Sequence, residues 1–103
     1  MATFQRIDAH GAKLLLAKDN VKLVDIRDEN SFETDHVEGA FHLTNDSVDQ
    51  FIKEVPYDKT VLVLCYHGIS SKGVAQYLCD QGYKDVYSVD GGFESWRIEN
   101  FSE

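Results

Sequence analysis

Short apolar runs and helical stripes alternate along the chain. Runs of apolar or β-branched residues are typical of strands, and apolar positions spaced three and four apart are typical of helices. Strands are expected at residues 4–7, 21–27, 40–43, 60–64 and 85–89. Helices are expected at residues 9–17, 28–34, 48–55, 71–81 and 93–98. This strict alternation predicts an α/β fold with a parallel sheet and right-handed crossovers.

The most apolar of these runs, residues 60–64, ends on Cys65. A short loop with one glycine and two serines follows, and a helix begins where the loop stops. Loop amides and a helix N-terminus should therefore point at one sulfur, favour its thiolate and leave an anion pocket beside it. The chemistry indicated is attack by Cys65 on a small anionic substrate. From these residues alone, the alternative that Cys65 is a small buried core residue stays open.

A second candidate, Arg27, lies at the carboxyl end of another expected strand. The carboxyl ends of parallel strands meet at one edge of a sheet, where ligands bind in such folds. We therefore expect Arg27 and Cys65 on the same rim. Arg27 either supports the loop or pairs with Asp25, and contact with substrate is the second choice.

Composition narrows the function classes. The chain has 103 residues and a formal net charge of -8, which suits one domain over residues 1–103. No basic cluster is present, so neither a nucleic acid nor an acidic membrane surface is an expected partner. An anionic substrate must then be held by local dipoles against the overall field. With two cysteines and no apolar leader at the N-terminus, a cytoplasmic location is expected.

Three separated motifs together resemble one family. Residues 24–27 (Val-Asp-Ile-Arg) lead into Ser31-Phe32 and then into residues 36–40 (His-Val-Glu-Gly-Ala). The six-residue loop 65–70 is the second motif, and residues 90–96 (Asp-Gly-Gly-Phe-Glu-Ser-Trp) are the third. In this order they resemble the single-domain rhodaneses, which are sulfurtransferases.

The resemblance implies a rhodanese-like α/β fold with a five-stranded parallel sheet and helices on both faces. It also implies that Cys65 takes sulfur from thiosulfate as a persulfide and passes it to cyanide or to a thiol such as thioredoxin or glutathione. That double displacement needs no metal and no organic cofactor. A homodimer is a further expectation from the resemblance alone.

The loop is the proposed anion cradle. Its backbone N–H groups would surround the persulfide or the sulfonate oxygens. The residues concerned are Tyr66, His67, Gly68, Ile69, Ser70 and Ser71. Ser70 and Ser71 can donate hydroxyls to the anion or can cap the helix, and the second alternative is at least as good. Gly68 permits a backbone conformation that a side chain would resist.

Two neighbouring side chains are auxiliary candidates. Lys72 could attract thiosulfate, although a solvated lysine is the preferred interpretation. His67 could favour the thiolate when protonated or line the pocket mouth, but no carboxylate near it in sequence would orient its ring for general-base work. Cys79 is expected to pack inside its helix rather than to act as a resolving thiol.

Three rival functions remain. A cysteine phosphatase or arsenate reductase would need an arginine at the position of Ser71 to clamp its oxyanion. A rhodanese-like binding module that has lost its chemistry fits poorly, because Cys65, Gly68 and both serines are present. A persulfide carrier or sensor remains open, and it would turn over thiosulfate poorly.

Overall fold

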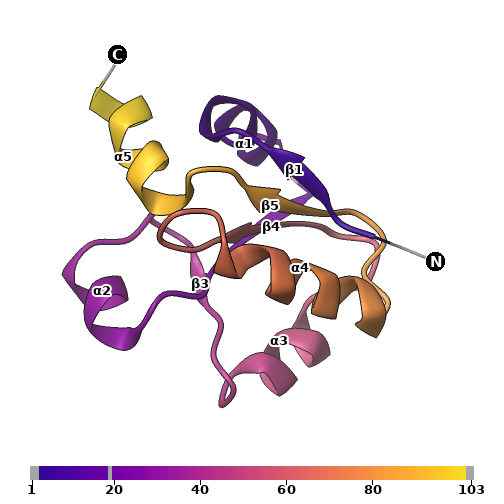
Figure 1. Ribbon diagram of the computed structural model, residues 1–103. Coiled ribbons are helices and arrows are strands. Elements are labelled where there is room, and N and C mark those ends of the chain that lie inside the picture. Colours follow the sequence, from indigo (N-terminus) through magenta and orange to yellow (C-terminus); the bar gives the residue numbers. More distant parts are fainter. Residues whose placement is uncertain (1–2, 19, 102–103) are drawn as a thin grey trace.

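The computed structural model describes residues 3–18 and 20–101 (Figure 1). Five strands alternate with five helices in these ranges, as the sequence predicts. They are β1 (Gln5–Ile7), α1 (Ala9–Leu16), β2 (Val21–Asp25), α2 (Glu29–Thr34), β3 (Phe41–His42), α3 (Val48–Glu54), β4 (Thr60–Leu64), α4 (Ser70–Gln81), β5 (Val86–Val89) and α5 (Gly92–Phe101). Within these ranges no helix is both long enough and apolar enough to cross a membrane.

The five strands form one parallel sheet in the order β1-β5-β4-β2-β3, which confirms the predicted fold class. Strand β4 lies in the middle and pairs with β2 and β5. Its apolar residues are buried on both faces, which is why this strand reads as a continuous apolar run. The carboxyl ends of β2 and β4 consequently meet at one edge, with Asp25 opposite Leu64.

Side chains of β4 alternate between two cores. Val61 and Val63 join the core formed with Phe51 of α3 and Leu78 of α4. Leu62 and Leu64 point the other way, into the core formed with α1 and α5. Figure 1 shows α3 and α4 on one side of the sheet and α1 and α5 on the other. Helix α2 buries no residue and lies at the edge of the sheet.

Several expected element ends are wrong by one to three residues. Strand β2 stops at Asp25 instead of residue 27, because the Asp25 carboxylate accepts a hydrogen bond from the amide of Arg27 at 2.9 Å and turns the chain. Helix α4 begins at Ser70 rather than Ser71, and α5 begins one residue early and continues to Phe101. No proline or glycine lies between residues 93 and 101 to end α5 at the expected position.

Candidate active site

Cys65 lies directly after β4, in the loop that leads into α4. Its side chain is almost fully enclosed, with 3% of the residue exposed. The amide of Gly68 donates to Cys65 Sγ at 3.1 Å, and the amide of Ser71, in the first turn of α4, donates at 3.2 Å. The loop and the helix N-terminus thus converge on one sulfur, as the spacing of these residues predicts.

The start of α4 is capped by this sulfur and not by a serine. The N-cap residue is Ile69, which has no side-chain capping hydrogen bond. Helix N-termini leave amides without intrahelical partners, and here Cys65 Sγ accepts one of them. The interpretation of Ser70 and Ser71 as capping side chains is therefore wrong.

Hydrogen bonds decide the ionisation of Cys65. Burial alone would raise the pKa of this thiol, because it removes the thiolate from water. Donors from the Ser71 side chain and from the amides of Ser71, Gly68 and His67 outweigh that effect and lower the pKa below its usual value. A lowered pKa together with a ring of donors is the environment of a reactive thiolate.

Gly68 lets the loop bend close to the following turn. It has a φ of +87°, in the left-handed region that side chains disfavour. A Cβ at this position would lie 2.6 Å from the backbone nitrogen of Gly91. Glycine is therefore required on two grounds, the backbone conformation and the lack of space.

The third motif places a second helix N-terminus against the same loop. The amide of Phe93 donates to the carbonyl oxygen of Cys65 at 2.6 Å, and the amide of Glu94 donates to that of Tyr66 at 3.3 Å. Gly92, with a φ of +60°, allows this approach, since its Cβ would lie 2.4 Å from the Cys65 carbonyl oxygen. Trp96 is buried in the core, as expected. The glycines thus hold the loop as well as forming a turn.

Arg27 forms part of the framework of the site. Its guanidinium pairs with Asp25 at 2.8 Å, and both side chains are buried, which confirms their predicted pairing. It also donates to the carbonyl oxygen of Asp35 at 2.6 Å and stacks 3.8 Å from the centre of the Phe93 ring. Arg27 therefore ties the turn after β2 to the start of α5, on the rim that holds Cys65.

The outer part of the loop is exposed and reaches two neighbouring helices. Tyr66 Oη lies 3.0 Å from the hydroxyl of Ser31 on α2. His67 Nδ1 lies 3.7 Å from a carboxylate oxygen of Glu94 on α5. The sequence near His67 offers no such carboxylate, and the structure supplies one from the third motif. Ile69 and Ser70 complete this exposed rim.

Two candidates remain, Lys72 and Cys79, and the structure adds Ser88 to them. Lys72 is half-buried in the first turn of α4. Cys79 packs in the core with 5% of the residue exposed, as expected. Ser88 was missed by the sequence analysis, although its hydroxyl lies 2.7 Å from that of Ser71. The available signal was a small polar residue inside the otherwise apolar strand of residues 86–89.

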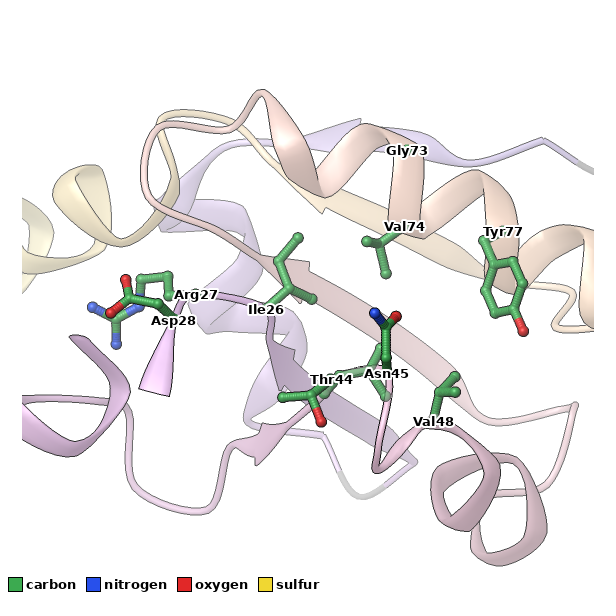
Figure 2. A pocket seen from close by; sticks show the side chains of 10 residues that line it. Ile26, Arg27, Asp28, Thr44, Asn45, Val48, Gly73, Val74 and Tyr77 are labelled. Carbon is green, nitrogen blue, oxygen red and sulfur yellow. The ribbon is translucent and has the colours of Figure 1, made fainter. Parts of the chain in front are cut away.

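A groove of about 580 Å³ runs beside the site (Figure 2). One wall is α4, with Gly73, Val74 and Tyr77, and the other consists of the segments that follow β2 and β3. Ile26, which lines the groove, donates through its amide to the carbonyl oxygen of Leu64, the residue before Cys65. The groove shares Arg27 with the framework of the site and is much larger than a thiosulfate or cyanide ion.

Comparison with known families agrees with the motifs. A family profile described as the rhodanese-like domain matches residues 8–99. The chain belongs to the rhodanese-like family. The motif-based resemblance is thereby confirmed, and the matched residues include Cys65 and its loop.

Relatives of this rhodanese-like chain include named enzymes. It is 51% identical over 100 residues to the thiosulfate sulfurtransferase GlpE of Vibrio cholerae, covering 97% of this chain and 94% of that one. It is 55% identical over 97 residues to GlpE of Tolumonas auensis, covering 94% and 92%. A solved structure from Rhodopseudomonas palustris, of unknown function and described as a possible tyrosine phosphatase, superposes with a TM-score of 0.79 at 29% identity, covering 94% of this chain and 82% of that chain.

Proposed function

We propose that this protein is a thiosulfate sulfurtransferase, a single rhodanese domain in which Cys65 is the nucleophile. The observation that carries the proposal is the convergence of the Gly68 and Ser71 amides on Cys65 Sγ, at 3.1 and 3.2 Å. The similarity to GlpE over nearly the whole chain supports the choice of thiosulfate as sulfur donor.

In the first half-reaction, the Cys65 thiolate attacks the outer sulfur of thiosulfate. The sulfur–sulfur bond of thiosulfate breaks, and sulfite leaves with the bonding electron pair. Cys65 then carries a persulfide anion, so the total charge is unchanged. The amides of Gly68 and Ser71 donate to the anionic sulfur, which is preorganised stabilisation of a moving negative charge.

In the second half-reaction, a thiophilic acceptor attacks the outer sulfur of the persulfide. With cyanide, thiocyanate forms and the Cys65 thiolate returns. A thiol such as thioredoxin or glutathione attacks as its thiolate and leaves with the sulfur as its own persulfide. The proposal includes a reducing compartment, the cytoplasm, as the cysteine content suggests, and a homodimer, as the resemblance implies.

Dipoles supply the attraction for the donor anion. The chain carries a formal net charge of -8, and Arg27 is already paired with Asp25. The overall field therefore opposes the approach of a dianion, and we expect weak binding of thiosulfate.

The arrangement disfavours a phosphatase or arsenate reductase. In those enzymes an arginine six residues after the nucleophile holds the oxyanion with two hydrogen bonds. Ser71 occupies that position here, and its side chain is fully buried and bonded to Ser88. The cradle therefore has no guanidinium at the point where phosphoryl transfer needs one.

The test is thiocyanate formation from thiosulfate and cyanide, with Cys65→Ser and Cys79→Ser beside the wild type. We expect the Cys65 variant to lose all measurable activity and the Cys79 variant to retain it. If the wild type is inactive with thiosulfate well into the millimolar range, thiosulfate is not the donor. Fast sulfur transfer from a low-molecular-weight persulfide would then indicate a persulfide carrier.

A further inference from the structure

A second cavity, the loop pocket, lies against the catalytic loop between α2 and α5 (Figure 1). Its volume is about 390 Å³, which is much more than a cyanide ion fills. The loop contributes Tyr66, the residue after Cys65, to its lining. Helix α5 contributes Phe93, whose amide donates to the carbonyl oxygen of Cys65. Both residues therefore connect the loop pocket to the backbone of the nucleophile.

Hydrogen bonds hold the Tyr66 side chain at the wall of the loop pocket. Ser31 Oγ donates to the Asp28 carboxylate at 2.7 Å, and the amide of Ser31 donates to the same carboxylate at 3.1 Å. A hydroxyl has one proton to give, so the contact of 3.0 Å between Ser31 Oγ and Tyr66 Oη uses the proton of Tyr66. The wall next to Cys65 is thus tied to α2.

Two exposed side chains of opposite charge line the loop pocket. They are Arg97 on α5 and Asp35, which follows α2. Both belong to the described part of the chain, and none of the ion pairs there joins one to the other. Arg27 also lines the pocket, but its guanidinium is already paired with Asp25. The pocket consequently offers a ligand one cation and one anion that do not neutralise each other directly.

A molecule that carries both an ammonium and a carboxylate group matches this arrangement. A guanidinium binds a carboxylate through two parallel hydrogen bonds, and a carboxylate accepts hydrogen bonds from an ammonium group. The net charge of the ligand matters too, because the chain has a formal net charge of -8 and repels simple anions. A zwitterion has no net charge and escapes that repulsion.

We propose that the loop pocket binds the α-amino-acid group of a low-molecular-weight thiol acceptor such as free cysteine, with its carboxylate on Arg97 and its ammonium on Asp35. The acceptor thiolate attacks the outer sulfur of the Cys65 persulfide. The sulfur–sulfur bond breaks, Cys65 leaves as a thiolate with the bonding pair, and the acceptor becomes a persulfide. This inference deepens the proposed function and rests on the Cys65 persulfide.

The experiment measures kcat/KM for four thiol acceptors, with thiosulfate as donor and sulfite release as the readout. Cysteine carries both charged groups, 3-mercaptopropionate the carboxylate, cysteamine the ammonium and 2-mercaptoethanol neither. In Arg97→Gln, kcat/KM relative to 2-mercaptoethanol should fall by about twofold to fivefold for cysteine and for 3-mercaptopropionate, the size expected of an exposed ion pair. Asp35→Asn should instead lower this ratio for cysteine and for cysteamine.

Lys84→Gln is the matched control for Arg97→Gln. It removes the same charge from an exposed residue just before β5, whereas Cys65 follows the carboxyl end of β4. All ratios should keep their wild-type values in Lys84→Gln, and Arg97→Lys, which retains the charge, should restore most of the ratio for cysteine. The inference is overturned if Arg97→Gln leaves the ratio for cysteine unchanged, or if Lys84→Gln lowers it equally.

Thiocyanate formation keeps this test separate from that of the proposed function. If the wild type forms no thiocyanate from thiosulfate and cyanide, thiosulfate is not the donor. The same thiol ratios are then measured as rates of discharge of a Cys65 persulfide that has been loaded with inorganic polysulfide. In that assay too, an unchanged ratio for cysteine in Arg97→Gln overturns the inference, and a twofold to fivefold fall of about the size given above supports it.

Discussion

Two cysteines lie near opposite ends of helix α4, and their surroundings have opposite effects on the thiol pKa. Cys65 lies just before its amino end and Cys79 lies in its last turns, and the two residues are 3% and 5% exposed. Burial raises the pKa of both thiols. At Cys65 hydrogen-bond donors reverse the direction, whereas at Cys79 the neighbouring Asp80 carboxylate adds to the increase. Similar burial therefore goes with a lowered thiol pKa at Cys65 and a raised thiol pKa at Cys79.

The two thiol pKa values differ because only some backbone amides lack a hydrogen-bond partner within the helix. Inside a helix every N–H group is bonded to a carbonyl four residues earlier, so no amide is available to Cys79. At the start of a helix the first amides have no such partner, and Cys65 Sγ accepts that of Ser71. Position relative to a helix end, more than depth in the protein, decides which cysteine can react.

The largest expected effect is a difference in reactivity between the two thiols. With iodoacetamide at pH 7, Cys65 should be alkylated about 100-fold faster than Cys79, because the thiolate is the reacting species. Mass spectrometry of the two cysteine peptides over time gives both rates in one sample. In urea, where both thiols lose their surroundings, the two rates should become similar. Equal rates in the folded protein would contradict the comparison.

Substitutions at two glycines test the contribution of the loop and that of the helix separately. Gly68→Ala places a Cβ 2.6 Å from the Gly91 nitrogen in a disfavoured backbone conformation, so the loop must move away from Sγ. Loss of preorganised donors of this kind costs on the order of 100-fold in turnover. We expect the thiosulfate–cyanide reaction to slow by about tenfold to 100-fold, and Cys65 alkylation to slow with it.

Gly73→Ala is the matched control for Gly68→Ala. A Cβ at Gly73 meets nothing within 4 Å, and the residue lies inside α4. The substitution should raise the free energy of unfolding by about 0.5 to 1 kcal/mol, because alanine is the better helix former. Urea unfolding measures this change. A loss of activity equal to that of Gly68→Ala would show that the helix, and not the loop geometry, controls Cys65.

The local sequence pattern was sufficient to predict the part of the site that is continuous in sequence, from the end of β4 to the start of α4. The apolar strand, the cysteine, the glycine and the following helix are adjacent in sequence, and each constrains the next. The alternation of strands and helices predicted the parallel sheet, and with it the common rim of Arg27 and Cys65. The same local pattern misplaced the end of β2, because the turn depends on a side-chain bond from Asp25 to the Arg27 amide.

The part of the site contributed by β5 and α5 depends on contacts between segments that are distant in sequence. Ser88 lies 17 positions after Ser71, and no periodicity reveals which residue of α4 its hydroxyl faces. The bond from the Phe93 amide to the Cys65 carbonyl joins α5 to the loop, and it requires the packing of the whole α5 side of the sheet. Glu94 comes close to His67 for the same reason. Such pairs are set by tertiary structure and not by spacing.

The smallest expected effect is on stability as pH changes. The folded pKa of Cys65 is lowered, so its contribution to stability is present above the unfolded value of about 8.5 and is lost as pH falls through the folded value. The folded pKa of Cys79 is raised, so its contribution is present below about 8.5 and is lost as pH rises through the folded value. The two cysteines thus give opposite slopes.

Urea unfolding of Cys65→Ala and Cys79→Ala at several values between pH 6 and 10 tests these slopes against the wild type. Relative to wild type, Cys65→Ala should become less stable as pH rises toward 8.5, and Cys79→Ala should become more stable as pH rises beyond it. Both changes should be about 1 kcal/mol or less, since one pKa unit corresponds to about 1.4 kcal/mol. Subtracting the wild-type curve removes the titration of tyrosines and lysines common to all three proteins. Slopes of the same sign would show that burial dominates at both thiols, and that the donors around Cys65 do not offset it.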